Sequence, residues 1–315
     1  MKILVTGGTG FVGRVAVSAL RAAGHAVRLA LRAPYAETSD ESVVVGEFGP
    51  ATDWTRALEG IDVVVHLAAR VHVMRDQADA AEEFKRTNTE GTLRLARAAA
   101  DAGARRFVFV STIKVNGEAT TGRPFCADDN PRPSDDYGRS KLEAEIGLHG
   151  IPGIESVIIR PPLVHGPGAK GNLARFCRLA HSGLPVPFGA IDNRRDLVGV
   201  ANLANLIERC VWHLGAPGEV FLAADGEPLS TPQLYRTIAE ALGRPARIIA
   251  VPIGLMRSVA RPLGFGGELD RLTQSLELDV SKTRERLDWR PPYKARDGIT
   301  AMARAFAAGN ACIRH

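Results

Sequence analysis

A tyrosine and a lysine four positions apart, Tyr137 and Lys141, could transfer protons together with an upstream hydroxyl residue, Thr112. Residues at i and i+4 share one face of a helix, so a helix here would place the phenol beside the ammonium. The phenol would act as acid or base, the ammonium would lower the phenol's pKa, and the hydroxyl would hold a substrate oxygen. The alternative is a solvent-exposed helix face that carries Tyr and Lys without a function. The predicted elements around the pair distinguish between these two interpretations.

The composition is that of an ordinary globular protein. The chain has 315 residues, 45% of them hydrophobic and 24% charged, which is enough for one large or two interleaved domains. The net charge of +5 comes from 40 basic and 35 acidic residues without a basic run, so small anionic molecules are expected as partners rather than nucleic acid.

Neither a metal site nor a membrane span is predicted. The four cysteines, Cys126, Cys177, Cys210 and Cys312, show no paired metal spacing and are interpreted as reduced thiols. No apolar run approaches the 18 residues that a spanning helix needs, and the chain enters a strand at once rather than a cleavable segment. A cytoplasmic protein is therefore expected.

The first residues carry a glycine pattern typical of dinucleotide binding. An apolar strand, Lys2–Thr6, is followed by three spaced glycines and by a segment with helical periodicity, Arg14–Ala23. The first glycine permits a tight turn, the second lets the backbone approach a pyrophosphate, and the third lets the helix pack on the strand. The helix N-terminus then offers free N–H groups to the phosphates. A glycine-rich turn without a ligand is the alternative. The contact residues expected here are Gly7, Gly10, Phe11, Val12 and Gly13.

The end of the second predicted strand, Ala26–Leu31, bears on the choice between NAD and NADP. An acid at this place usually holds the adenosine ribose of NAD, whereas a nearby arginine accommodates the extra phosphate of NADP. Here Arg32 follows the strand, and no acid comes before Glu37. Arg32 is therefore assigned to the 2′-phosphate of NADP(H), with NAD as the alternative cofactor and a solvated arginine as the alternative role.

Further cofactor contacts are expected after the next two strands. A short strand over Val43–Val45 leads to residues that could meet the adenine, and Asp62–Ala69 is a nearly continuous apolar strand with a small-residue exit. That pattern is typical of a parallel strand covered on both faces. His66, inside the strand, is interpreted as a core histidine rather than a catalyst. The expected contact residues are Glu47, Phe48, Leu67, Ala68 and Ala69.

Strands and helices alternate through the first half of the chain. A helix over Glu82–Ala102 precedes the strand Arg106–Val110, and another strand covers Glu155–Arg160. This order predicts an α/β fold with a Rossmann-type, doubly wound parallel sheet. Thr112 then lies at the carboxyl end of a strand, where open α/β sheets bind ligands. The long polar loop Glu118–Asp136 leads to Tyr137, and loops of that size are often functional.

The Pro/Gly-rich run after Arg160 marks a domain boundary near residue 165. We expect a dinucleotide-binding domain over residues 1–165, with 196–226 returning to it. Residues 166–195 and 227–315 would form a smaller, mixed C-terminal domain that binds the substrate. Within these segments the sequence predicts a helix over Asn172–Ser182, a strand over Val220–Ala223 and a helix over Thr231–Leu242.

With these motifs in place, the sequence resembles the extended short-chain dehydrogenase/reductase family, and more narrowly its nucleotide-sugar epimerase/dehydratase/reductase branch. The resemblance covers nearly the whole chain and is specific for the family rather than for one member. The segments that carry it, beside the glycines and the Thr-Tyr-Lys set, are Asp62–Ala69, Asn88–Gly91, Arg160–Gly168, Arg195–Val198 and Ser281–Pro291.

The resemblance implies roles for the residues that match the family's motifs. Thr112 matches the hydroxyl that hydrogen-bonds the sugar C4 oxygen, and Tyr137 matches the acid/base. Lys141 matches the lysine that lowers the pKa of that tyrosine and holds the nicotinamide ribose. Pro161 matches backbone beside the nicotinamide.

The resemblance also implies contacts to the substrate. Arg195 matches an arginine that grips the diphosphate, with a surface ion pair to Asp196 as the alternative. Asn172 lies where the family's asparagine contacts the substrate phosphates, with a helix cap as the alternative. Lys114 and Asn116 lie near the catalytic hydroxyl and are expected to shape sugar specificity.

Departures from the family pattern reduce the number of reactions that we expect this protein to catalyse. The 4,6-dehydratases carry Thr-Asp-Glu where this chain has Thr112-Ile113-Lys114, so no group is evident for the elimination of water. The segment Ile113–Glu118 and the run from His66 to Met74 resemble 4-ketoreductases and 4-epimerases of bacterial O-antigen UDP-N-acetyl-sugar synthesis.

We therefore expect NADPH-dependent reduction at C4 of a UDP-linked 4-keto-6-deoxy-(N-acetyl)hexose, with Tyr137 as proton donor. The nearest alternative is a UDP-hexose 4-epimerase with tightly bound NAD, and a non-catalytic dinucleotide sensor is a third. The resemblance also implies a homodimer formed through the helix that carries Tyr137 and the long helix before it.

Overall fold

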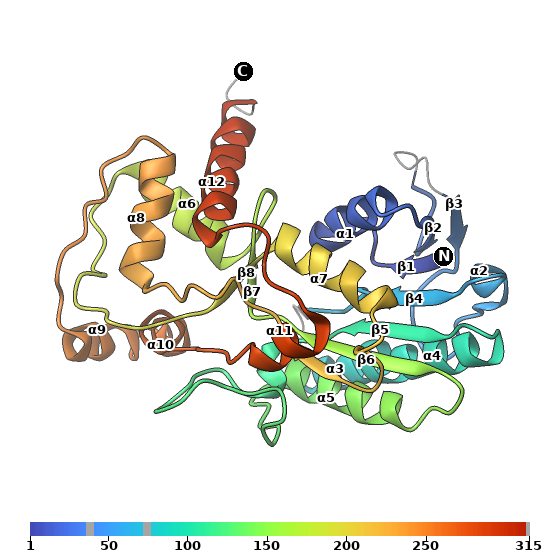
Figure 1. Cartoon of the computed structure of the whole chain (residues 1–315). Coiled ribbons are helices and arrows are strands. Elements are labelled where there is room, and N and C mark those ends of the chain that lie inside the picture. Colours follow the sequence, from blue (N-terminus) through green and yellow to red (C-terminus); the bar gives the residue numbers. More distant parts are fainter. Residues whose placement is uncertain (36–40, 72–76, 313–315) are drawn as a thin grey trace.

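Seven parallel strands form the central sheet of the protein (Figure 1). The computed structural model describes residues 1–35, 41–71 and 77–312. The strand order is β3-β2-β1-β4-β5-β6-β9, and every neighbouring pair runs parallel. This is the doubly wound sheet that the alternating elements predict, with the change of direction between β1 and β4. The strands are β1 (Lys2–Thr6), β2 (Ala26–Leu31), β3 (Glu41–Val44), β4 (Val63–His66), β5 (Arg106–Val110), β6 (Glu155–Arg160) and β9 (Val220–Leu222).

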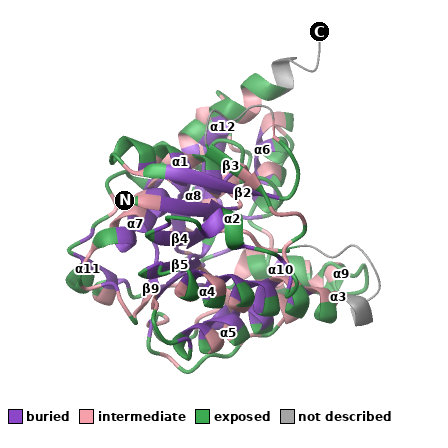
Figure 2. Cartoon of the chain, turned by 90° about the vertical axis from the view of Figure 1, so that its right-hand side faces the viewer, coloured by how far each residue is buried: buried purple, intermediate pink, exposed green. Residues whose placement is uncertain are grey.

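Helices cover both faces of this sheet. Successive residues of a strand point to opposite faces, so Ile3 and Val5 pack under α1 and α7, whereas Leu4 packs under the helices of the other face. The central strands are buried along their length, as Figure 2 shows for β1, β4 and β5. The covering helices are α1 (Phe11–Ala22) and α7 (Val200–Trp212) on one face, and α2 (Thr55–Leu58), α4 (Gly91–Asp101) and α5 (Asp136–His149) on the other.

The helix expected over Glu82–Ala102 has an irregular middle. The chain forms α3 (Gln77–Phe84), then a π-helical segment over Lys85–Glu90, then α4. Within the π segment the buried Asn88 accepts a hydrogen bond from the Arg70 backbone N–H and donates to the Arg70 carbonyl and to the Ser140 hydroxyl. Widened turns of this kind often mark functional sites. Here the turn ties the chain after β4 to the helix that carries Tyr137.

The C-terminal part builds a second hydrophobic core beside the sheet. It centres on α6, α8 and α12, whose apolar faces enclose Phe176, Tyr235 and Ile299. A two-stranded parallel pair, β7–β8, lies between this core and the main sheet (Figure 1). The elements are β7 (Leu163–His165), α6 (Asn172–Ser182), β8 (Leu197–Gly199), α8 (Thr231–Ala241), α9 (Ile253–Ala260), α10 (Gly266–Thr273), α11 (Ser281–Leu287) and α12 (Ala295–Cys312).

The sequence located two helices of this part, α6 and α8. The helix over Asn172–Ser182 is confirmed, and the helix after Ser230 begins at Thr231, where Ser230 and Gln233 form a reciprocal capping box. The short strands β7 and β8 were not predicted. The division into domains stays a prediction, although β9 joins the main sheet beside β6. Within the described ranges, no helix has the length and apolar content that crossing a membrane requires.

Candidate active site

The turn after β1 is shaped by glycines that no other residue could replace. Gly7 has φ of 69°, and a Cβ atom built on it would lie 2.8 Å from the Ala68 backbone nitrogen. A Cβ on Gly13 would overlap the carbonyl oxygen of Gly7. The turn is therefore packed against the exit of β4 and against its own helix, as a loop must be if a pyrophosphate is to lie close to the backbone.

The N-terminus of α1 is open to an anion. Gly10 precedes the helix in an extended conformation, and no side chain caps it. The Gly10 N–H donates to the Gly7 carbonyl at 3.0 Å, whereas the N–H groups of Phe11, Val12 and Gly13 have no acceptor within the helix. Those three groups and the positive end of the helix dipole fit a phosphate. The expected cofactor contacts in this segment lie together, and the cradle fits NAD(P).

The exit of β4 lies beside this turn, as expected from its small residues. The Ala68 N–H donates to the Thr6 hydroxyl at 3.2 Å, and Leu67, Ala68 and Ala69 are all partly exposed. His66, just before them, is buried and bonded through one ring nitrogen to Thr6 and through the other to Thr92. Burial, and next the Lys141 charge, lower the pKa of His66 to about 3. It is a neutral core histidine, as the sequence indicated.

The residues expected at the adenosine end are more loosely arranged. Arg32 follows β2 and is exposed, and Glu37 lies outside the described residues. The Glu47 carboxylate is exposed and lies 3.7 Å from Arg86. The Phe48 ring packs against Trp54, with ring centroids 5.3 Å apart. The role of Arg32 toward a 2′-phosphate stays a prediction.

Tyr137 and Lys141 stand on one face of α5, one turn apart. Lys141 is 1% exposed, and its ammonium lies 3.9 Å from the centroid of the Phe109 ring on β5. Burial lowers the pKa of Lys141 to about 7, against the opposing effect of Glu145. A lysine so placed can move between charged and neutral forms near neutral pH.

The pKa of Tyr137 departs from expectation. We expected the protein to lower it, but burial and next the Asp135 carboxylate raise the pKa of Tyr137 to about 12. The Tyr137 ring meets the Phe84 ring edge-on, with centroids 6.0 Å apart. The difference arises because the phenolate loses hydration on burial and faces the Asp135 carboxylate. Charged Lys141 and a bound cation such as the nicotinamide ring would oppose this increase in the phenol pKa.

Thr112 lies at the carboxyl end of β5, as predicted. Its hydroxyl accepts a hydrogen bond from the Lys114 N–H at 3.3 Å and caps a 3₁₀ turn over Ile113–Val115. The Ile113 N–H donates to the carbonyl oxygen of Pro161 at 2.9 Å, which joins the ends of β5 and β6. Thr112 and Pro161 are thus held on the same edge of the sheet as the glycine turn.

Arg195 lies where a short extended segment crosses between the two cores. It pairs with Leu229 on one side and Leu276 on the other, and its guanidinium donates to the Gln274 carbonyl at 2.9 Å. The surface ion pair with Asp196 does not form, because the Asp196 carboxylate accepts the Leu278 N–H instead. Among the described residues Arg195 has no salt bridge, and its charge remains available to a ligand.

A second arginine lies close enough to act on Arg195. Burial and next the Arg271 charge lower the pKa of Arg195, while the Glu118 charge opposes them. Arg271, on α10, was not predicted as a site residue, since the sequence around it matches no motif. Asn172 is exposed as the first residue of α6, where Gly171 occupies the capping position, so the expected helix-cap alternative does not hold.

Two residues expected to shape sugar specificity are engaged within the protein. The Asn116 side chain is buried, accepts from Arg160 at 2.9 Å and donates to the Cys126 carbonyl at 2.9 Å. The Lys114 ammonium is bound by Asp135, and by Glu118 at 3.1 Å. The influence of Asn116 on sugar specificity stays a prediction, and these partners leave its side chain no free polar group for a direct contact. The predicted contact of Lys114 with substrate is not supported by these partners.

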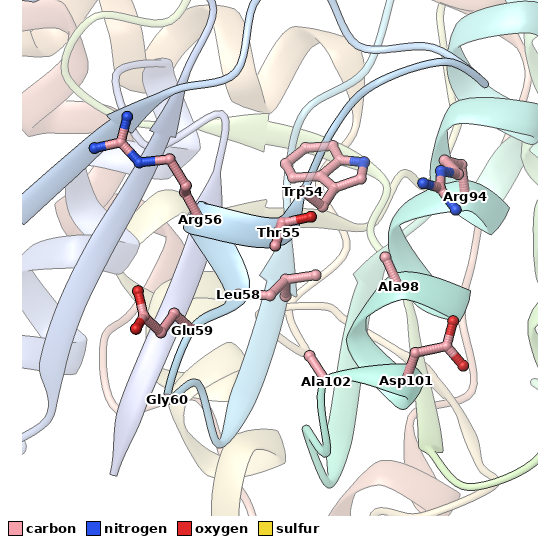
Figure 3. A pocket seen from close by; sticks show the side chains of 10 residues that line it. All are labelled: Trp54, Thr55, Arg56, Leu58, Glu59, Gly60, Arg94, Ala98, Asp101 and Ala102. Carbon is pink, nitrogen blue, oxygen red and sulfur yellow. The ribbon is translucent and has the colours of Figure 1, made fainter.

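A hollow of about 710 Å³ between α2 and α4 does not belong to the site (Figure 3). Figure 3 shows Trp54, Leu58, Arg94 and Asp101 around it. Its lining residues precede β4 and β5, so it lies toward the amino ends of the strands, whereas the glycine turn, Thr112 and Pro161 lie at the carboxyl ends.

Comparison with known proteins agrees with this arrangement. The model of the NAD dependent epimerase/dehydratase family matches residues 3–224. A "UDP-glucose 4-epimerase" of Vibrio cholerae is 43% identical over 318 residues, which cover 98% of this chain and 96% of that protein.

Two solved structures share the fold over the whole chain. A short-chain dehydrogenase/reductase superfamily protein of Agrobacterium tumefaciens with bound NAD is 25% identical, with a TM-score of 0.78 and coverage of 100% of this chain and 99% of that one. MoeE5 in complex with UDP-glucuronic acid and NAD is also 25% identical, with a TM-score of 0.78 and coverage of 98% and 100%. The chain belongs to the NAD dependent epimerase/dehydratase family of the short-chain dehydrogenase/reductase superfamily.

Proposed function

We propose that the protein is a UDP-hexose 4-epimerase that retains NAD. The observation that carries the proposal is Tyr137 and Lys141 on one face of α5, at the sheet edge that also holds Thr112 and the glycine turn. The 43% identity to a protein named UDP-glucose 4-epimerase, over nearly the full length of both chains, favours this reaction over the C4 reduction first expected.

The residues of the site can perform the proton transfers of such a reaction. NAD held by the glycine turn over Gly7–Gly13 would supply reversible hydride transfer at sugar C4, so that either configuration at C4 can form from the 4-keto sugar. Tyr137 would remove the O4 proton as C4 is oxidised. It would return the proton to O4 after the 4-keto sugar has rotated to present its opposite face. Thr112 would donate a hydrogen bond to O4, where negative charge develops. Charged Lys141 would favour the phenolate that acts as base.

The substrate's diphosphate would lie between the two cores. The Arg195 guanidinium donates to the Gln274 carbonyl, the Arg271 charge acts on Arg195, and Asn172 is the first residue of α6 in the C-terminal core. Two guanidinium groups can bind phosphate oxygens in the planar, bidentate manner that lysine cannot reproduce. The sugar would then extend toward Tyr137 and Thr112.

Reduction with NADPH remains a second candidate, and one observation favours it. Arg32 is exposed at the end of β2, at the place where many NAD enzymes carry an acid, and could meet a 2′-phosphate. An NADPH-dependent reductase would release its cofactor after each turnover.

The test is to purify the protein, identify any bound dinucleotide by mass spectrometry and assay the interconversion of UDP-glucose and UDP-galactose. Retained NAD with interconversion in the absence of added cofactor supports the epimerase. An empty protein that binds NADPH far more tightly than NADH, and shows no interconversion, contradicts it. The Y137F variant serves as the control for contaminating epimerase.

We also propose a homodimer formed through α4 and α5. The resemblance to the family implies this contact, and Ile146 on α5 is an apolar side chain that is 64% exposed. A two-fold contact between the α4–α5 faces of two copies would cover it.

A further inference from the structure

Lys114 lies between two carboxylates beside the catalytic helix. Its ammonium contacts Asp135 and lies 3.1 Å from Glu118, and all three side chains are about one-third exposed. At this degree of exposure, solvent screens both ion pairs of Lys114, so they contribute little to the stability of the fold. Its location suggests a different use.

Asp135 connects Lys114 to Tyr137. One carboxylate oxygen of Asp135 accepts the Gly138 N–H at 2.7 Å and so caps α5, while the other binds the Lys114 ammonium. Tyr137 is the second residue of that helix. The carboxylate that fixes the start of the helix is therefore also a negative charge beside the phenol, and it is one of the two causes that raise the phenol's pKa.

Glu118 connects Lys114 to the phosphate side of the site. The Glu118 charge acts on Arg195 as well as on Lys114. A carboxylate that paired with Arg195 would compete with the diphosphate of a substrate. Lys114 holds Glu118 at 3.1 Å and offers it a cation of its own.

We propose that Lys114 is a positioning residue of this site: it offsets the Asp135 charge beside Tyr137 and keeps Glu118 from pairing with Arg195. The proposal rests on the epimerase function and its use of Tyr137 as acid and base. It assigns to Lys114 a role through two acids rather than the sugar contact that the sequence suggested.

The other charges around Tyr137 do not replace Lys114. On α5 itself, Lys141 is buried below the phenol, and Asp136 is paired with Arg139 at 2.6 Å. From α3, Phe84 presents an uncharged ring, and Glu83 is paired with Arg70 at 2.5 Å. Below the phenol, Glu145 is paired with Arg160. Of the described charges, Lys114 is the cation bound directly to Asp135.

Removal of the Lys114 charge should shift the pH dependence of catalysis in a defined direction. In K114M, the unpaired Asp135 carboxylate destabilises the phenolate, so the pKa of Tyr137 rises. Because the proposed reaction starts from the phenolate, the acidic limb of kcat against pH should move to higher pH by about one unit, the low end of the effect of a close charge. The KM for the UDP-sugar should also rise, since Glu118 is freed toward Arg195.

The variants are compared as NAD-loaded enzyme in the interconversion of UDP-glucose and UDP-galactose. K114R keeps the charge and should restore the wild-type profile. D135N removes the acid but keeps a residue suited to capping, so its profile should move to lower pH. K282M is the matched control, because Lys282 also joins two carboxylates, Asp128 at 2.7 Å and Glu219 at 2.9 Å, away from this site. Its profile should not move.

The proposal is overturned if K114M has the wild-type dependence of kcat on pH and an unchanged KM. It is also overturned if the dependence of kcat on pH in K114R resembles that in K114M. Ultraviolet titration of the Tyr137 phenolate, taken as the difference from Y137F, measures the same pKa without turnover. If no interconversion is found but K114M still raises that pKa, the proposed function fails and the role of Lys114 stands. If interconversion is found but K114M leaves the pKa of Tyr137 unchanged in the titration, the proposed function stands and the role of Lys114 fails.

Discussion

The ammonium of Lys141 lies 3.9 Å from the centroid of the Phe109 ring, in the sheet directly under the helix that carries Tyr137. A cation over an aromatic face is partly stabilised, but here burial is the stronger effect and lowers the pKa of Lys141 to about 7. The lysine that we expect to favour a phenolate is thus poised to lose its own proton near neutral pH.

This lysine should therefore cost stability at and below neutral pH. Its folded pKa lies below its ordinary value of 10.5, so between about 7 and 10.5 the unfolded chain binds more protons than the folded chain. Stability should accordingly rise with pH across that window. K141M should be more stable than the wild type at pH 6 to 7 by on the order of a few kcal/mol, and the gap should close toward pH 10.

Urea denaturation of the cofactor-stripped proteins at several pH values measures this difference. K170M serves as the control, because Lys170 is exposed. A K141M variant less stable than the wild type at every pH would mean that the attraction of the Glu145 charge and the Phe109 contact outweigh the loss of hydration.

Replacement of Tyr137 by phenylalanine should abolish turnover without loss of the fold. The Phe84 contact and the burial of the ring are kept in Y137F, while the proton donor and acceptor is lost. The expected fall in kcat is about 10²- to 10⁴-fold, the usual contribution of general acid–base catalysis. Bound NAD per protein should stay at the wild-type level, and turnover near that of the wild type would remove Tyr137 from the mechanism.

Replacement of Gly13 by alanine should prevent the cofactor cradle from forming. The added Cβ would overlap the Gly7 carbonyl, so α1 must move away from the turn. The expected result is loss of bound NAD together with a lower melting temperature. G254A, on α9, is the matched control because its Cβ would meet nothing within 4 Å. Equal NAD content in G13A and wild type would contradict the assignment of the turn.

Replacement of Arg195 or Arg271 should weaken binding of the UDP-sugar without affecting binding of NAD. R195M and R271M should each raise the KM for the UDP-sugar by roughly 10-fold or more, since a charge-assisted hydrogen bond contributes about 1.5–3 kcal/mol. Arg194, which is exposed and paired with Glu277 at 2.7 Å, supplies the control variant R194M. The content of bound NAD should be unchanged in all three. A raised KM in R194M alone would place the diphosphate elsewhere.

Replacement of Ile146 by lysine should weaken the proposed dimer. The side chain is 64% exposed on α5, so a charge there is harmless in a monomer but lies within the expected two-fold contact. Light scattering after gel filtration should show a dimer for the wild type and a smaller mass for I146K. A wild-type monomer would end the proposal of a homodimer.

The sequence was most informative where one physical cause determines one feature. Glycine spacing after an apolar strand located the cradle, and the apolar runs located β5 and β6 with their bounds. The strand expected over Asp62–Ala69 forms as β4 but ends three residues earlier, at His66. The short strands β7 and β8 could not be predicted, because three residues carry no recognisable period. The π turn at Asn88 likewise depends on side-chain contacts with segments distant in the sequence.

The electrostatics of the site could be predicted only in part. Tyr137, Lys141 and Thr112 follow from a motif, but the pKa of Tyr137 depends on burial and on Asp135, which a spacing argument does not measure. Lys114 was expected to contact the sugar, but its two acidic partners lie 4 and 21 positions away and become evident only in the fold. Arg271 lacks a motif altogether and is identified by its effect on Arg195.

The most direct test of the central claim is the conversion of UDP-glucose to UDP-galactose by the purified protein without added cofactor, with the bound dinucleotide identified in the same sample. We predict interconversion to equilibrium, with NAD retained by the protein throughout. A protein that is empty on purification, requires added NADPH and reduces a 4-keto sugar without interconverting the two hexoses would contradict this account.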